Sequence, residues 1–210
     1  MGKEGFIQMT QIIRKYTGCF FAAVLVVALI VPTNAFADTQ ETSGADIDIA
    51  AVGTRSGPFI VSPGHRTVWD GLHVLDITGG SMSNSAQLIV WPNNGVQGSS
   101  NQRFYFEEVG TDYRGEKFYK IRNVKTGKVL DISGGVAYNG APIIQFTDHG
   151  GKNQLWYFRG SLTSYFQIVS ALDDHYCMDI EGSGKANGTR VILWTNNKAN
   201  NQKFHRAITF

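Results

Sequence analysis

Three sets of polar and aromatic residues recur along the chain at matching spacings. In each set an aspartate is followed fifteen positions later by an aromatic residue, and 22 to 25 positions later by an Asn-Gln pair. A further asparagine lies in register between them, at Asn84, Asn139 and Asn187. Carboxylates and amides form hydrogen bonds, and an aromatic ring offers a flat apolar surface, so each set is suited to binding a ligand with both kinds of surface. The members are Asp76, Trp91 and Asn101; Asp131, Phe146 and Asn153; and Asp179, Trp194 and Asn201.

The residues around each set form short apolar runs separated by clusters of Gly, Asn and Asp, which indicates short strands joined by turns. The second set lies on four such runs, FYKIRNV, KVLDIS, APIIQF and QLWYFRG. No segment after residue 37 has a helical periodicity of useful length. A unit used three times favours an all-β barrel of three four-stranded repeats with pseudo-threefold symmetry, because closure removes the sheet edges. The repeats span about 57–110, 111–160 and 161–210.

The threefold unit of aspartate, aromatic and Asn-Gln-x-aromatic resembles the ricin B-type lectin family, whose members fold as a β-trefoil with Gln-x-Trp repeats. The resemblance covers roughly residues 57–210, and turns such as NGAPIIQF and GGKNQLW are similar to those of bacterial members. It implies up to three shallow carbohydrate-binding pockets, one in each repeat. In each pocket the aspartate would accept hydrogen bonds from vicinal sugar hydroxyls, the aromatic would lie under the pyranose ring, and the asparagine would add a hydrogen bond.

The resemblance also implies that the end of each motif is structural, with the glutamine holding the turn and the second aromatic filling the core. These residues are Gln102 and Phe104, Gln154 and Trp156, and Gln202 and Phe204. A sugar has a rim of hydroxyls and faces of C–H groups, so a carboxylate and an amide beside a flat ring suit it on chemical grounds as well. His149, on the loop beside the second set, is either a further donor to a sugar hydroxyl or a solvated histidine.

One departure from the family is the same in all three repeats. Plant members carry a glutamine two residues before the stacking aromatic, where it helps to hold the aspartate, and this chain has Ile89, Ile144 and Ile192. The uniform change indicates a variant subtype. The galactose preference typical of plant members is therefore not expected to carry over.

The N-terminus has the pattern of a secretory signal peptide. Basic residues precede an apolar run at 19–31, and an Ala-x-Ala sequence ends at Ala37, after which cleavage is expected. The apolar run of 13 residues is shorter than the roughly 18–20 that a spanning helix needs, and an uncleaved anchor is the alternative. Residues 38–56 are interpreted as a flexible spacer before a single domain at 57–210. The protein is thus predicted to be secreted, with no membrane span after cleavage.

The charge and cysteine content of the predicted mature chain narrow the classes of partner. Cleavage of the signal segment removes three of the 19 basic residues and one of the 17 acidic residues, which leaves 16 of each. The mature chain therefore lacks the clustered positive charge that nucleic-acid binding requires. Only Cys177 remains, which excludes an intramolecular disulfide. The histidines have no metal-ligand spacing, and two carboxylates at Asp46 and Asp48 are too few for calcium. No metal or cofactor is expected.

The sequence favours a binding protein over an enzyme. It contains none of the usual nucleophile or metalloprotease motifs, and one aspartate in each repeat places the carboxylates far apart in a threefold barrel. We predict a secreted, non-enzymatic, multivalent lectin that recognises glycans or polysaccharide. The alternative is a protein-interaction β-trefoil, such as an inhibitor or a toxin-associated subunit, with vestigial sugar sites. Solvent exposure of the aspartate and aromatic pairs distinguishes the two.

Overall fold

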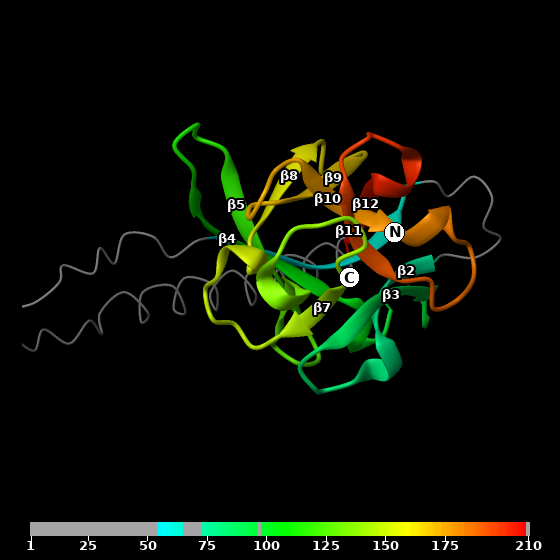
Figure 1. Cartoon of the computed structure of the whole chain (residues 1–210). Coiled ribbons are helices and arrows are strands. Elements are labelled where there is room, and N and C mark those ends of the chain that lie inside the picture. Colours follow the sequence, from blue (N-terminus) through cyan, green and yellow to red (C-terminus); the bar gives the residue numbers. More distant parts are fainter. Residues whose placement is uncertain (1–53, 65–72, 96–97, 209–210) are drawn as a thin grey trace, which may run out of the picture. The chain divides into compact units, whose positions relative to one another are not determined.

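The computed structural model describes residues 54–64, 73–95 and 98–208 (Figure 1). The predicted signal peptide and residues 38–53 of the predicted spacer lie outside this range. In the described part, no helix has the length and apolar character needed to cross a membrane.

The strands are β1 (Arg55–Pro63), β2 (His73–Ile77), β3 (Ala86–Pro92), β4 (Phe104–Thr111), β5 (Lys117–Asn123), β6 (Val129–Ile132), β7 (Ile143–Phe146), β8 (Trp156–Gly160), β9 (Phe166–Ser170), β10 (Tyr176–Ile180), β11 (Val191–Thr195) and β12 (Phe204–Ile208). Short 3₁₀ turns are η2 (Thr78–Gly80), η3 (Ser100–Gln102), η4 (Ser133–Gly135), η5 (Lys152–Gln154), η6 (Glu181–Ser183) and η7 (Asn200–Gln202).

Six of the strands close into a barrel. Antiparallel pairs run in a ring from β1 to β4, β5, β8, β9, β12 and back to β1. The other six strands form three hairpins, β2–β3, β6–β7 and β10–β11. A barrel with one hairpin for each of three four-stranded repeats is a β-trefoil, so the fold predicted from the sequence is confirmed.

The three hairpins meet around one side chain. Gln87 Nε2 lies 2.9 Å from each of three carbonyl oxygens, those of Leu88, Ile143 and Val191, which occupy equivalent positions in the three repeats. Pairing of β3 with β7 and bridges from Ile89 to Arg190 and from Pro142 to Ile192 complete the contacts between hairpins. The hairpins are thereby fixed relative to one another, and so are the residues they carry.

Alternation along the hairpin strands decides which side chains enter the core. In β2, Leu75 and Ile77 belong to the buried hydrophobic core, and Asp76 between them points to the opposite face. The same alternation places Asp131 on the outer face of β6 and Asp179 on the outer face of β10. Each aspartate is therefore presented away from the core by a strand whose neighbouring residues are firmly packed.

The aromatic residue that ends each Asn-Gln-x-aromatic motif lies at the start of a barrel strand. Phe104, Trp156 and Phe204 are each 0% exposed and belong to one core cluster. Trp156 Nε1 also donates to the carbonyl oxygen of Leu130, at 3.3 Å. Cys177 is buried outside this cluster, and burial raises the pKa of its thiol to about 12, so it is an unreactive thiol at neutral pH.

Candidate ligand-binding pockets

Strand pairing explains why the aspartate and the aromatic of each set share a face. Each aspartate lies directly across its hairpin from one of the three isoleucines that replace the glutamine of plant lectins. The aromatic lies two residues beyond that isoleucine, and residues two apart on a strand point the same way. The spacing of fifteen residues therefore corresponds to one hairpin, in which the second strand pairs with the first. The cross-strand pairs are Asp76 with Ile89, Asp131 with Ile144, and Asp179 with Ile192.

Each aspartate is held by the glutamine of the following Asn-Gln pair. The three glutamines are 0% exposed, and each Nε2 donates to a carboxylate oxygen. Each Nε2 also donates, at 2.9 Å, to the carbonyl of the residue after the aromatic, and each Oε1 accepts a backbone N–H at 3.0 Å. The amide therefore ties the carboxylate to the loop after the aromatic. The Nε2–Oδ2 distances are 2.8 Å for Gln102 to Asp76, 2.8 Å for Gln154 to Asp131 and 2.9 Å for Gln202 to Asp179.

The asparagine of each pair also donates to the aspartate. Asn101 and Asn153 donate from Nδ2 to the same Oδ2 that accepts the glutamine, both at 3.0 Å, so Oδ1 of Asp76 and of Asp131 is left for a ligand. In the third repeat Asn201 donates to Oδ1 of Asp179, at 2.8 Å. The asparagine predicted to face the ligand thus has its N–H group turned to the carboxylate, and its oxygen is the atom better placed for a ligand.

The aromatic residues stand at the open side of the pockets. Trp91 and Trp194 are each 39% exposed and Phe146 is half-buried, in contrast to the fully buried Trp156. Cavities of about 500, 370 and 460 Å³ lie over the first, second and third sets. In all three cases the lining includes the aspartate, the isoleucine, the aromatic and the asparagine. The structure therefore brings all nine sequence-predicted pocket residues together, three to a pocket.

From the sequence alone, the three isoleucines indicate only the loss of a polar support. In the structure they line the pockets beside the aspartates, with exposures of 7% for Ile89, 6% for Ile144 and 2% for Ile192. The buried glutamine of the Asn-Gln pair holds the carboxylate instead. Strand alternation was the signal that could have placed each isoleucine opposite its aspartate.

The second pocket differs from the others by a histidine. His149 Nε2 lies 3.3 Å from Oδ2 of Asp131, and Nδ1 accepts the N–H of Gly151 at 3.2 Å, which makes Nε2 the protonated nitrogen of the neutral ring. The ring meets Phe146 edge-on, with centroids 6.0 Å apart. Equivalent loop positions in the other pockets are Asn94 and Asn197.

The first and third pockets carry different charged groups. Lys125 lines the first and donates from Nζ to the carbonyl of Gly80 at 2.6 Å. Glu181 lines the third and is paired with the guanidinium of Arg190, whose Nε donates to Oε2 at 2.8 Å and whose terminal nitrogen contacts Oε1. That hydrogen-bonded guanidinium lowers the pKa of Glu181. The three pockets are thus alike in their aspartate and aromatic and distinct at their rims.

Burial changes the acidity of two of the aspartates. The pKa of Asp76 and of Asp179 is raised above the ordinary 3.8, mainly because the surrounding protein withdraws water from the carboxylate. Hydrogen bonds from the neighbouring Gln and Asn side chains oppose this effect.

The asparagines in register between aspartate and aromatic join neighbouring repeats. Asn84 Oδ1 accepts both the backbone N–H and the hydroxyl of Thr147, each at 3.1 Å, and Thr147 follows Phe146 in the next repeat. Asn139 Oδ1 accepts the same two groups of Thr195, after Trp194, at 2.7 and 2.9 Å. The first repeat has Pro92 at the corresponding position, which has no N–H, and Asn187 Oδ1 instead lies 2.8 Å from Nε2 of His73.

A comparison with protein-family models agrees with this geometry. Residues 100–194 match the family described as ricin-type beta-trefoil lectin domain-like. The match includes parts of all three repeats. A search of curated protein sequences gave no match.

Solved structures with the same fold include designed and natural proteins. The designed three-fold symmetric protein ThreeFoil is 24% identical, with a TM-score of 0.61 over 72% of this chain and 99% of that one. An exo-beta-1,3-galactanase from Clostridium thermocellum is 27% identical, with a TM-score of 0.63 over 73% of this chain, but the match spans only 30% of that enzyme. A ricin B-like lectin from Macrolepiota procera, solved with lactose, is 19% identical, with a TM-score of 0.54 over 75% of this chain and 97% of that one. These likenesses establish the β-trefoil fold.

Proposed function

We propose that the protein is a secreted, non-enzymatic lectin that binds glycans or polysaccharide through its three pockets. The observation that carries this proposal is the shared construction of the pockets, in which a preformed carboxylate lies beside a solvent-facing aromatic ring. Hydroxyl groups of a sugar would donate to the carboxylate while its C–H face stacks on the ring. Structural neighbours described as lectins, including one solved with lactose and one with GalNAc, support binding of carbohydrate in general.

Binding at one such pocket is expected to be weak and binding at several to be strong. A monosaccharide has about a dozen heavy atoms, and at about 0.3 kcal/mol per atom a shallow pocket gives about 4 kcal/mol, a millimolar affinity. Three pockets on one rigid fold can engage one polysaccharide, and the effective concentration raises the affinity by orders of magnitude. A repetitive glycan surface is therefore the partner that the fold suits best.

The carboxylates in the pockets do not support glycoside hydrolysis. That reaction uses two carboxyl groups about 5–10 Å apart, one of them protonated as the general acid. The first and second pockets are each lined by a single carboxylate. The third has Glu181 beside Asp179, but Arg190 binds Glu181 and lowers its pKa, which opposes the protonated form a general acid needs.

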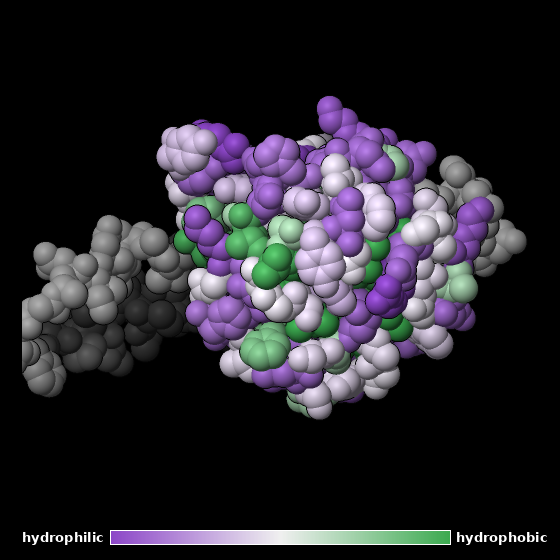
Figure 2. Space-filling view, viewed as in Figure 1, coloured by the Kyte–Doolittle hydropathy of each residue, from purple (hydrophilic) through white to green (hydrophobic). Residues whose placement is uncertain are grey.

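The protein-interaction alternative has less support. The two tryptophan rings meet the predicted exposure, since Trp91 and Trp194 are each 39% exposed. The aspartates do not meet it, since all three are 3–4% exposed. On the face shown in Figure 2, hydrophilic side chains predominate and apolar ones appear only in small separate patches. That face therefore carries no large contiguous apolar patch of the kind that marks many protein interfaces.

Glycan-array binding of the purified protein tests the proposal. A variant with Asp76→Asn, Asp131→Asn and Asp179→Asn, shown to be folded by its circular dichroism and thermal unfolding, is measured beside it. We expect signals on a subset of neutral glycans that the variant loses. A folded parent that binds no glycan or polysaccharide would refute the lectin proposal and direct the search to protein partners.

The pH dependence of binding follows from the raised pKa of Asp76 and Asp179. As the pH falls, binding at the first and third pockets should begin to weaken at a pH above 3.8, the ordinary pKa of an aspartate. The reason is that a protonated carboxyl is a poorer hydrogen-bond acceptor. Stability changes in the opposite sense: a carboxyl whose pKa is raised by folding adds stability in its protonated form, and this stability is lost as the pH rises through the folded pKa. Titrations and thermal unfolding from about pH 7 to pH 3 should show binding weaken before the fold is lost. Loss of both at one pH would contradict this.

Contacts between repeats predict that Asn139 serves the third pocket rather than its own. Asn139→Ala removes both hydrogen bonds to Thr195 and should weaken sugar binding roughly three- to tenfold, about the effect of one hydrogen bond. Titration in a Trp91→Ala, Phe146→Ala background isolates the third pocket. Asn139→Asp keeps an acceptor oxygen and should restore most of the affinity.

The control is Asn139→Ala in a Trp91→Ala, Trp194→Ala background, where only the second pocket remains. It should have no effect on the affinity, and a loss there would show that the contact acts on the second pocket.

A further inference from the structure

A fourth cavity, larger than each of the three pockets, lies outside them. Its volume is about 550 Å³, against 370 to 500 Å³ for the pockets. It is bounded by the β4–β5 turn, strand β8, the first residue of turn η5 with Leu155 after that turn, and the loop between β9 and β10. The second and third repeats both contribute to it, so it is not part of the repeated pocket design.

The floor of the cavity is apolar and aromatic. Tyr157 is 7% exposed, and the ring of Phe118 meets it edge-on with centroids 6.4 Å apart. Both pack with Val169, Cys177 and Ala171 in a small cluster separate from the barrel core. At the turn above this floor, Tyr113 is 95% exposed, beside the guanidinium of Arg114 at 5.6 Å. The cavity therefore has an aromatic floor and a solvent-facing aromatic side chain at its rim, both suited to the apolar face of a sugar ring.

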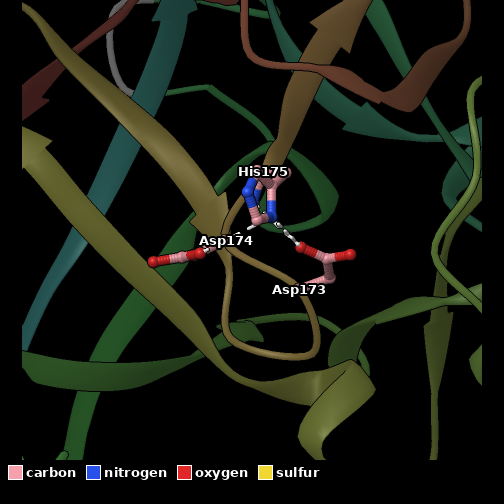
Figure 3. A group of neighbouring side chains, drawn as sticks. All are labelled: Asp173, Asp174 and His175. Atoms are coloured by element: carbon pink, nitrogen blue, oxygen red, sulfur yellow. Dashed lines mark hydrogen bonds and ion pairs between the residues drawn. The ribbon is translucent and has the colours of Figure 1, made fainter.

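A network of ion pairs fixes the walls. Arg114 on the β4–β5 turn and Arg159 on β8 both donate to Oδ2 of Asp174, at 3.0 and 2.9 Å, and Arg159 also binds Glu116 at 2.8 Å. Figure 3 shows Asp174 on the same loop as Asp173 and His175, with the histidine ring turned to Asp173. Asp173, Asp174 and His175 each offer one ligand atom, and these atoms lie within 4.8 Å of one another. Two guanidinium groups already bind the Asp174 carboxylate, and their positive charge opposes a metal ion there. The walls are thus preformed.

The remaining polar groups at the rim are balanced in charge. Lys152 offers an ammonium group, and Asp173 offers a carboxylate whose Oδ1 accepts Nδ1 of His175 at 2.8 Å. One unpaired donor and one acceptor beside an aromatic floor suit a neutral ligand rich in hydroxyl groups better than a strongly charged one.

The cavity adjoins the second pocket across a single turn. Lys152 and Asn153 are consecutive residues of η5, and Lys152 lines the cavity while Asn153 lines the second pocket. Consecutive Cα atoms are about 3.8 Å apart, so the linings of the two cavities meet at this turn. The second pocket has the smallest volume of the three and the smaller aromatic, Phe146, and gains most from added contacts.

We propose that this cavity binds further units of a neutral oligosaccharide whose first unit occupies the second pocket. The inference rests on the proposed lectin function and specifies its ligand: at this site the protein recognises a chain rather than a single sugar. Tyr113 stacks on a distal unit, and Lys152 donates to its hydroxyls. The first and third pockets remain sites for single units.

Calorimetric titration with ligands of increasing length tests the proposal. The probes are mono-, tri- and pentasaccharides of three neutral series, β-1,3-galactan, β-1,3-glucan and β-1,4-xylan. The protein carries Trp91→Ala and Trp194→Ala, so that only the second pocket remains. In at least one series the pentasaccharide should bind roughly tenfold more tightly than the monosaccharide, about the effect of one aromatic contact. The combined substitutions Tyr113→Ala and Lys152→Ala should bring the affinity for the pentasaccharide to within about twofold of the affinity for the monosaccharide. They should leave monosaccharide binding unchanged.

Tyr138→Ala provides the matched control, because Tyr138 is also an exposed tyrosine, at 50%, and lines none of the four cavities described. It should keep the full dependence on length. Equal affinity for all lengths, or a dependence that survives the double substitution, would overturn this inference and leave the lectin proposal standing. Absence of binding to every probe, by a protein that binds glycans on the array, would overturn this inference alone. Absence of binding on the array as well would overturn both.

Discussion

Replacement of Trp91, Phe146 and Trp194 together by alanine is expected to weaken binding to a polysaccharide at least a hundredfold and to leave the fold intact. Each ring contributes about 0.5–1.5 kcal/mol of stacking, and the losses combine because three weak sites act on one ligand. Trp91 and Trp194 are 39% exposed, so their removal opens no cavity in the core. Binding to an immobilised polysaccharide and thermal unfolding of the same preparations measure the two effects.

Exposed apolar residues away from the pockets provide the control for this triple variant. Met82 and Val136 are 58% and 60% exposed and line none of the pockets. Met82→Ala with Val136→Ala should change neither binding nor stability. Unchanged polysaccharide binding by the folded triple variant would contradict the assignment of the three rings as the sugar-contacting surface.

A second large effect is expected from Gln154→Leu, which should lower the free energy of unfolding by about 3 kcal/mol. The leucine occupies a similar volume but removes the donor to Asp131 and to the carbonyl of Thr147, and the acceptor for the N–H of His149. Buried polar groups, one of them a carboxylate, are then left short of partners. Chemical denaturation followed by tryptophan fluorescence measures the change, and sugar binding at the second pocket should be lost as Asp131 moves.

Asn153→Ala is the matched comparison for Gln154→Leu. Asn153 donates to the same Oδ2 of Asp131 at 3.0 Å, but its side chain is half-buried, so water can replace it. The loss of stability should be about 1 kcal/mol or less. Equal losses from the two substitutions would show that the buried glutamine does not hold the carboxylate more firmly than the asparagine.

The fold was predictable because the repeat unit is carried by local features. Apolar alternation, Gly-rich turns and a spacing of fifteen residues between Asp131 and Phe146 define a hairpin without reference to the rest of the chain. Three such units, each unable to bury its own apolar face, have to close on one another. The same alternation brings the aspartate, isoleucine and aromatic to one face, so the pocket members could be chosen from the sequence.

Contacts between repeats could not be predicted, because they depend on how hairpins distant in sequence approach each other. Asn139 was visible as a residue in register, but nothing in the sequence showed that its partner is Thr195 of the next repeat. The place of Gln87 among three equivalent carbonyls has no repeated sequence signal, since the second and third repeats have no glutamine there. The cavity at Tyr157 likewise arises where two repeats meet.

Nuclear magnetic resonance of the tryptophan indole N–H groups during titration tests the central claim most directly. The sugar is the one selected on the glycan array, and the signals are assigned by single Trp→Phe variants. The indole signals of Trp91 and Trp194 should shift as the sugar binds. The signal of Trp156, which is 0% exposed and donates to Leu130, should remain in place. A sugar that binds to saturation without moving the Trp91 or Trp194 signal would contradict the assignment of these pockets as the carbohydrate-binding sites.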